Sequence, residues 1–161
     1  MMFERFKEVQ CACERCSRMC QGPCCGTPQE MRKIIEAGFG GRLMFDEGPG
    51  GPDLLKPALR GFEGEYAPWQ TRSEDGCTFW KDGLCELHDI GLKPIQGRLA
   101  HHDLSEGETV EIGLEISDSW KGPEAENVIQ LWKEKHLYGF CSPGTGWLPD
   151  NPHVRLENLS R

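Results

Sequence analysis

Several features that would indicate a membrane-bound, secreted or nucleic-acid-binding protein are missing from this sequence. No apolar run approaches the ~20 residues that a helix needs to cross a bilayer. The first ten residues, MMFERFKEVQ, are charged and lack the apolar core of a secretory signal. A formal net charge of −8 provides no general basic surface for nucleic acid. We therefore expect a cytoplasmic protein that binds neither membranes nor nucleic acid.

Common enzyme signatures and a large apolar core are also missing. The chain has no phosphate-binding loop, no G-x-S-x-G turn and no H-E-x-x-H helix. Hydrophobic residues make up only 37% of it, and it contains 20 glycines and 11 prolines. A length of 161 residues is typical of one domain, here residues 1–161. We expect a small, irregular α+β domain in which a bound ion compensates for a thin core.

Cysteine is abundant and concentrated in the sequence. Six of the nine cysteines lie in C-A-C-E-R-C-S-R-M-C-Q-G-P-C-C, from Cys11 to Cys25. Two more, Cys77 and Cys85, lie in a second short segment, C-T-F-W-K-D-G-L-C-E-L-H. In a reducing compartment, clustered thiols are more often metal ligands or redox groups than structural disulfides. The sequence therefore predicts a metal site that links the two segments.

The predicted ligands come from both segments, as in zinc sites that are built from two short hooks. His88 has ordinary ligand spacing, three residues after Cys85. Adjacent cysteines rarely bind one tetrahedral ion together, so the pair at 24 and 25 indicates two metals, or one ligand and one bystander. The predicted ligand set is Cys16, Cys20, Cys24, Cys25, Cys77, Cys85 and His88. Ligand softness favours Zn²⁺, with iron or a four-cysteine iron–sulfur cluster as the alternative.

The other cysteines and histidines leave alternatives open. Cys11 and Cys13 are either free thiols or part of a second, looser site. In His101-His102-Asp103, one histidine could bind metal through one ring nitrogen and donate its other ring N–H to the aspartate. Alternatively, the three are ordinary polar loop residues. Cys141 stands alone and is expected to be a buried thiol.

Local signals place these residues on secondary structure. The sequence Thr27-Pro-Gln-Glu30 is typical of a helix N-terminus and predicts a helix over about 28–37. Such a terminus would favour thiolates at the two cysteines just before it. Two β-prone runs around Asp82-Gly83 predict a hairpin with Cys77 and Cys85 on adjacent strands.

The C-terminal third is predicted to form a strand–helix extension over residues 105–161. Val110, Ile112, Leu114 and Ile116 alternate with polar residues, which predicts a half-buried strand over 109–116. Pro123 opens a predicted helix that runs to about residue 138. The whole chain should then combine a few helices and short antiparallel strands around the metal site.

Three motifs together resemble a known family. The first is Cys16, Cys20 and the Cys24-Cys25 pair, with three residues between Cys16 and Cys20 where two are usual. The second is G-C-T-F over residues 76–79 followed by C-E-L-H over 85–88, and the third is P-I-Q-G-R over 94–98. This arrangement resembles the YkgJ-like cysteine-cluster family, described as zinc- or iron-chelating proteins. The resemblance covers about residues 13–100.

The resemblance implies a metal-binding protein in which the N-terminal cysteines and the central Cys/His hairpin jointly chelate metal. Gly97 departs from the family, which has cysteine in this place, and thereby removes one implied ligand. Two alternatives follow. One is an iron–sulfur oxidoreductase or electron-transfer protein. The other is a metal-dependent hydrolase whose zinc carries water in a position left open by the missing ligand.

Overall fold

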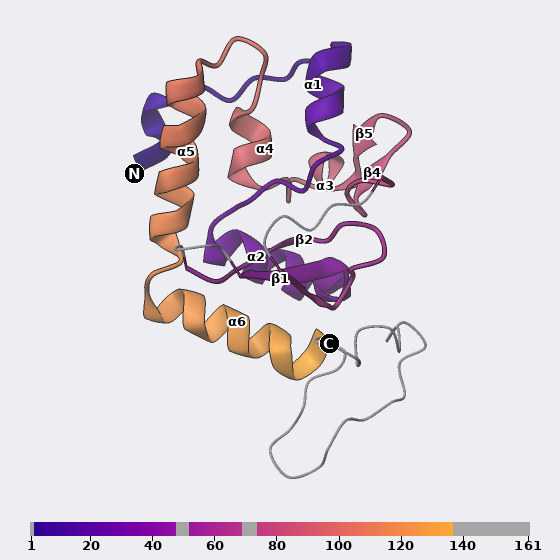
Figure 1. Ribbon diagram of the computed structural model, residues 1–161, viewed down its shortest axis with the longest axis vertical. Helices are drawn as coiled ribbons and strands as arrows, with labels where there is room; N and C mark the ends of the chain where they lie inside the picture. The colour runs from indigo at the N-terminus through magenta and orange to yellow at the C-terminus, as the bar shows by residue number, and fades with distance from the viewer. Residues whose placement is uncertain (1, 48–51, 69–73, 137–161) are drawn as a thin grey trace.

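The computed structural model describes residues 2–47, 52–68 and 74–136 (Figure 1). Within these ranges the fold is α+β, as predicted, with helices that outweigh short strands. The helices are α1 (Glu14–Met19), α2 (Pro28–Ile34), α3 (Glu86–Asp89), α4 (Ile95–Leu99), α5 (Glu106–Ser119) and α6 (Pro123–His136). Short 3₁₀ segments lie at Met2–Arg5 and Gly40–Arg42. Residue 141 and the end of the predicted helix, 137–138, lie outside the described residues.

The larger sheet has three strands in the order β2-β1-β3. Its centre is β1 (Leu43–Glu47), which pairs antiparallel with β2 (Leu54–Pro57) and parallel with β3 (Tyr66–Pro68). The proline at the end of β2 is tolerated because β2 is an edge strand. This mixed sheet departs from the all-antiparallel expectation in one pairing.

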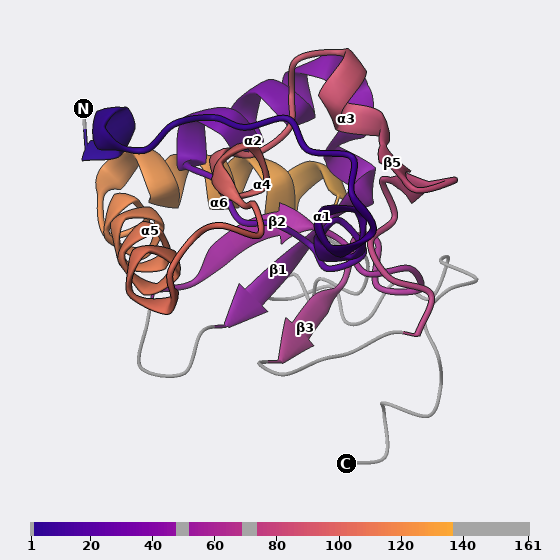
Figure 2. The same ribbon diagram turned by 90° about the horizontal axis from the view of Figure 1, so that it is seen from above.

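The core forms where α2 and α6 pack on one side of this sheet and on each other (Figure 2). Apolar side chains that are at most 5% exposed fill it, from the two helices and from the sheet. They include Met31, Ile34, Phe45, Leu55, Val128 and Trp132. The Trp132 indole N–H donates to the Gly40 carbonyl at 2.9 Å, so the ring is buried without an unpaired polar atom.

The start of α2 confirms the predicted capping box. The Glu30 backbone N–H donates to Thr27 Oγ1 at 3.3 Å, and the Thr27 N–H donates to the Glu30 carboxylate at 2.9 Å. After Ile34 the helix widens into a π turn that ends at Phe39, with Gly38 at a φ of 92°. Gly38 supplies the left-handed conformation that ends the helix, as the sequence predicted.

The central hairpin is also confirmed, with shorter strands than predicted. Strands β4 (Trp80–Lys81) and β5 (Leu84–Cys85) pair around Asp82 and Gly83, whose φ values of 52° and 82° fit a type I′ turn. Cys77 precedes the hairpin and forms an isolated bridge with Leu59 instead of pairing with Cys85. The segment after β5 turns into α3, so the histidine at 88 lies on a helix.

The predicted strand over 109–116 is wrong, because this segment lies inside helix α5. Ile112 and Ile116 are 3% and 2% exposed, whereas Val110 and Leu114 are 56% and 62% exposed. The two buried residues are four apart and share one helix face. A capping box between Ser105 and Glu108 starts the helix and outweighs the alternating pattern.

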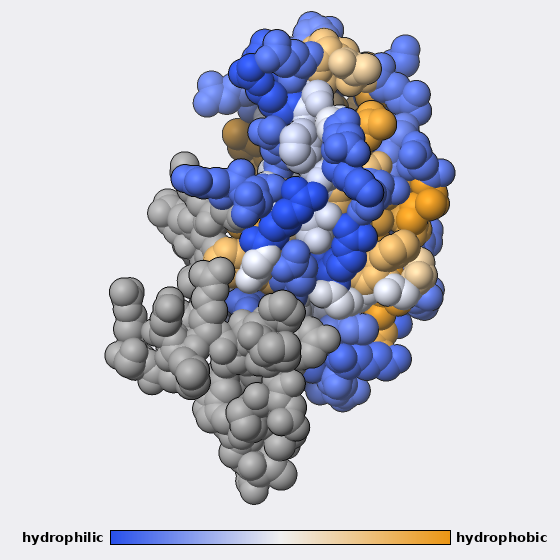
Figure 3. All heavy atoms as spheres, turned by 90° about the vertical axis from the view of Figure 1, so that its right-hand side faces the viewer, coloured by the Kyte–Doolittle hydropathy of each residue, from blue (hydrophilic) through white to orange (hydrophobic). Residues whose placement is uncertain are grey.

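The surface agrees with the acidic, polar composition. Figure 3 shows that hydrophilic residues dominate one side of the molecule and that apolar residues gather there in small patches. In the described ranges no helix is both long and apolar enough to cross a membrane.

Candidate metal centre

Four side chains converge where the N-terminal segment meets the loop after α4. The ligand atoms of Cys11, Cys13, Cys16 and His102 all lie within 4.8 Å of one another. His102 Nδ1 lies 3.6, 3.5 and 3.3 Å from the three sulfurs, in chain order. We call these four residues the outer group. Over the described residues no other set of three Cys, His, Asp or Glu side chains is this close together.

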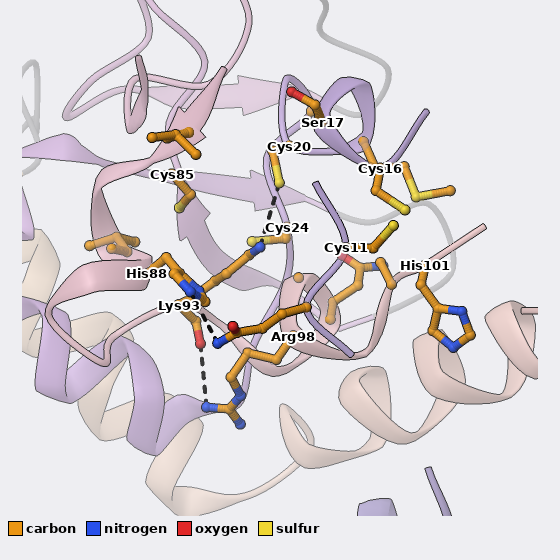
Figure 4. Close-up of a pocket in the computed structure, with 18 of the residues that line it drawn as sticks. Cys11, Cys16, Ser17, Cys20, Cys24, Cys85, His88, Lys93, Arg98 and His101 are labelled. Carbon is orange, nitrogen blue, oxygen red and sulfur yellow. Dashed lines mark hydrogen bonds between the residues drawn. The ribbon is translucent and has the colours of Figure 1, made fainter. Parts of the chain in front are cut away.

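Local structure explains why the three sulfurs meet. Cys13 is the N-cap of α1, and its carbonyl accepts the Ser17 N–H at 2.9 Å. One turn of helix places Cys16 on the same side as Cys13. Cys11 precedes the helix, and Figure 4 shows its sulfur beside that of Cys16.

His102 reaches the sulfurs from the loop between α4 and α5. Its Nδ1 faces the cysteines, and its Nε2 lies 3.4 Å from Asp103 Oδ1. An imidazole that uses one nitrogen for a metal commonly directs the other to a carboxylate, which fixes the ring orientation. His101 differs, because its Nδ1 accepts the Asp103 backbone N–H at 3.2 Å and its ring points away from the thiols (Figure 4).

The outer thiols differ in acidity. The Cys16 backbone N–H, followed by the Cys11 thiol, lowers the pKa of the exposed Cys13 to about 7. Burial raises the pKa of Cys16 to about 11. Cys13 is therefore half ionised near neutral pH, whereas Cys16 needs a bound cation to lose its proton.

The outer group supplies a known type of donor set. Three thiolates and one imidazole form a Cys₃His tetrahedron, which is one of the usual structural zinc sites. Soft sulfur donors select zinc, copper(I) or iron–sulfur centres over magnesium and calcium. Four protein ligands fill the tetrahedron and leave no position for a reactive water.

No family model matches the chain. Comparison with curated proteins and with solved structures finds no significant match either. The resemblance to the YkgJ-like family therefore rests on the cysteine motifs alone.

The ligands predicted from the sequence fall into different places. Of that set, only Cys16 belongs to the outer group. Five others, four cysteines and His88, line a cavity of about 1090 Å³, whose wall also includes Cys11 and Cys16 (Figure 4). We call the four cysteines the inner thiols: Cys20, Cys24, Cys77 and Cys85. None of the eight described cysteines forms a disulfide.

Burial favours the neutral form of three of the inner thiols, Cys24, Cys77 and Cys85. Burial raises the pKa of Cys24 well above its usual value, and the neighbouring Cys77 and Cys85 raise it further. Burial likewise raises the pKa of Cys77 to about 11. Lys93 opposes this effect at Cys24, and its Nζ donates to Cys20 Sγ at 3.5 Å.

Gly97 lies directly against these thiols. A Cβ atom at this position would come within 2.9 Å of both Cys24 Sγ and Lys93 Cε. The sulfur and the lysine chain therefore occupy the space that a cysteine at 97 would need.

Cys25 and His88 belong to neither group. The side chain of Cys25 packs against the core, and its N–H donates to Gln96 Oε1 at 2.6 Å. This placement fits the alternative in which one cysteine of the 24–25 pair is a bystander. His88 is exposed at the cavity rim, with its Nε2 3.4 Å from Gln10 Nε2.

Cys11, Cys13 and His102 are the residues that the predicted ligand set left out. The signal for them was present, since C-x-C-x₂-C is dense ligand spacing and His102 is followed by an aspartate. Nothing in the sequence, however, shows that the loop after α4 returns to this cluster.

Proposed function

We propose that the protein binds zinc at the outer group, through the three sulfurs and His102 Nδ1. The observation that supports this most directly is the position of that nitrogen, 3.3–3.6 Å from all three sulfurs. Only short movements would bring the four atoms to zinc–ligand bond lengths of about 2.0–2.3 Å. A reducing cytoplasm, which keeps the thiols free, is the proposed location.

The proposed zinc has a structural role. It joins residues that are 86 positions apart in the chain, Cys16 and His102, and so fastens the N-terminal segment to the loop after α4. Zinc that binds only the folded chain adds its binding free energy to stability. A hydrolytic zinc is not favoured, because the four protein ligands leave no open position.

Elemental analysis of protein purified without oxygen tests this proposal. We expect one zinc per chain in the unaltered protein and in His101→Ala, and at least a tenfold weaker affinity in His102→Ala. The two histidines are adjacent, so this pair separates ligation from a general change in the loop. Equal zinc affinity in both variants would refute the outer group as the site.

A second candidate function concerns the inner thiols, two from each of the two cysteine segments: Cys20 and Cys24 from the first, Cys77 and Cys85 from the second. No three of these sulfurs meet the 4.8 Å spacing of the outer group, and all four line one cavity. This wider spacing favours an iron–sulfur cluster, which takes four cysteines, over a single ion. The role would then be electron transfer, the alternative that the cysteine pattern left open.

Colour and sulfide content distinguish this candidate. Anaerobically reconstituted protein should show visible absorption and acid-labile sulfide, and both should disappear in Cys85→Ser. A colourless protein that retains only zinc after reconstitution with iron and sulfide would rule out the cluster.

A further inference from the structure

The N-terminal segment before α1 forms part of the cavity wall. Residues 7–12 adopt neither helix nor strand, and residues 8–12 line the cavity that contains the inner thiols. Both ends of the segment are fixed. Phe6 packs against the core, and Ser17 of α1 donates its hydroxyl to the Gly83 carbonyl at 3.0 Å. Figure 2 shows the N-terminal chain crossing over the other elements toward α1.

Between these ends the wall has weak polar contacts with the body of the protein. The Val9 N–H donates to the Arg98 carbonyl at 3.4 Å, which is long for such a bond. Glu8 pairs with the Arg98 guanidinium at 3.0 Å, but the Glu8 side chain is 61% exposed. An exposed ion pair contributes roughly 0–1 kcal/mol. Gln10 Nε2 adds one exposed contact, 3.4 Å from His88 Nε2. These contacts alone would allow the wall to open.

The outer group provides a much stronger attachment at the same place. Cys11 is the second-last residue of the wall and Cys13 follows the wall directly, and both sulfurs face His102 on the opposite loop. A bound ion would replace these sulfur–nitrogen contacts with coordinate bonds from all four side chains. The wall would then be fastened at its C-terminal end, beside the cavity.

We propose that residues 7–13 are a lid over the inner thiols and that metal in the outer group keeps this lid closed. With metal bound, soft metal ions and electrophilic thiol reagents reach the inner thiols, three of which are partly exposed beneath the lid, more slowly. When the outer metal is removed, the lid opens and these reagents enter. The inference rests on zinc binding at the outer group and adds to it a control of access to a second set of thiols.

The test measures how fast N-ethylmaleimide modifies Cys24. In this reaction the sulfur forms a bond to one alkene carbon, the carbon–carbon π bond is consumed, and the thiol proton ends on the neighbouring carbon. The triple variant Cys20→Ser, Cys77→Ser, Cys85→Ser leaves Cys24 without inner partners, so zinc cannot protect it through the inner site. Peptide mass spectrometry with fragment spectra distinguishes Cys24 from Cys25.

We expect zinc to slow the modification of Cys24 at least tenfold in this background. Adding His102→Ala should abolish the zinc effect, whereas adding His101→Ala should preserve it. If the triple variant does not fold, amide hydrogen exchange over residues 7–12 of the unaltered chain gives the same information. Exchange there should slow when one equivalent of zinc is bound.

The outcomes separate the lid from the zinc site. Stoichiometric zinc binding with unchanged Cys24 modification and unchanged exchange over residues 7–12 would overturn the lid and leave the zinc site standing. Failure of the unaltered chain to bind zinc would overturn both. A zinc effect that persists with His102→Ala would also overturn the lid, because the closure would then not depend on the outer group.

Discussion

The outer group and the inner thiols each combine N-terminal cysteines with residues from later in the chain, but they differ in how ready they are to hold a metal ion. The outer side chains are already assembled, and Cys13 and His102 are exposed. The inner thiols are more widely spaced around a cavity and come from two segments far apart in the chain. The outer group can therefore take an ion from solvent directly, whereas the inner thiols must first be reached and then drawn together.

Acidity follows burial rather than this division, since the buried Cys16 of the outer group also has a pKa raised to about 11. A backbone N–H at the start of α1 lowers the pKa of Cys13 to about 7, whereas burial raises the pKa of Cys77 to about 11. Exposure combined with a nearby donor makes a metal-capturing thiolate, and burial makes a neutral thiol that packs as a small apolar group. The same residue type thus has two roles that are set by its surroundings.

The largest effect should come from comparing Cys16→Ala with Cys20→Ala. These positions are one helical turn apart, but only Cys16 belongs to the outer group. Changing a residue that hydrogen-bonds to a metal ligand typically weakens metal affinity ~10–100-fold. Removal of a ligand itself should weaken it further. We expect Cys16→Ala to lower zinc affinity more than 100-fold and Cys20→Ala to retain the outer zinc, both measured by competition with a chelator. Similar losses in both variants would show that the two groups are not separate.

The pH dependence of zinc affinity should give the next largest effect. Because the pKa of Cys16 is raised to about 11, zinc displaces at least its proton throughout the neutral range. Each displaced proton changes affinity about tenfold per pH unit, and affinity falls as pH falls. We expect at least a hundredfold weaker affinity at about pH 6 than at about pH 8. Chelator competition in buffers of constant ionic strength measures it, and a flat profile would contradict thiol ligation.

Local signals in the sequence predicted much of the fold. The capping box at Thr27, the stop at Gly38 and the turn at Asp82-Gly83 depend on neighbouring residues and were confirmed. Helix α5 was missed because Ile112 and Ile116 satisfy both a period of two and a helical spacing of four. The cap between Ser105 and Glu108 resolves that ambiguity, and it was readable from the sequence.

The candidate site was less predictable because it depends on long-range topology. The sequence offers His88, His101 and His102 as ligands of similar local quality. Only the path of the chain after α4 brings the last of these to the N-terminal cysteines. The division of Cys24 and Cys25 between cavity and core likewise depends on how the segment packs beside α4.

A smaller effect should appear in the stability of the metal-free protein. Cys77 is 5% exposed, and burial raises its pKa from 9.0 to about 11. Because the folded protein holds this proton more tightly than the unfolded chain, the stabilisation is complete below about pH 9 and is lost as the pH rises toward about 11. We expect the ionisation of Cys77 to lower the free energy of unfolding by about 3 kcal/mol. Urea unfolding measures the free energy of unfolding at each pH. Between about pH 9 and pH 11 it should fall more steeply in the unaltered protein than in Cys77→Ala. Parallel falls in the two proteins would contradict the raised pKa of Cys77.

The smallest effect should come from the Asp103 carboxylate, which contacts the proposed zinc ligand His102. Asp103 Oδ1 lies 3.4 Å from His102 Nε2, and the Asp103 side chain is 77% exposed. Residues that hydrogen-bond to a metal ligand typically contribute ~10–100-fold to metal affinity. Because this contact is long and exposed, Asp103→Asn should weaken zinc binding by only about tenfold. The stability of the metal-free protein should remain unchanged, because the side chain is exposed. Chelator competition and urea unfolding measure the two quantities. An equal loss of metal-free stability would mean that Asp103 orders the loop rather than the imidazole.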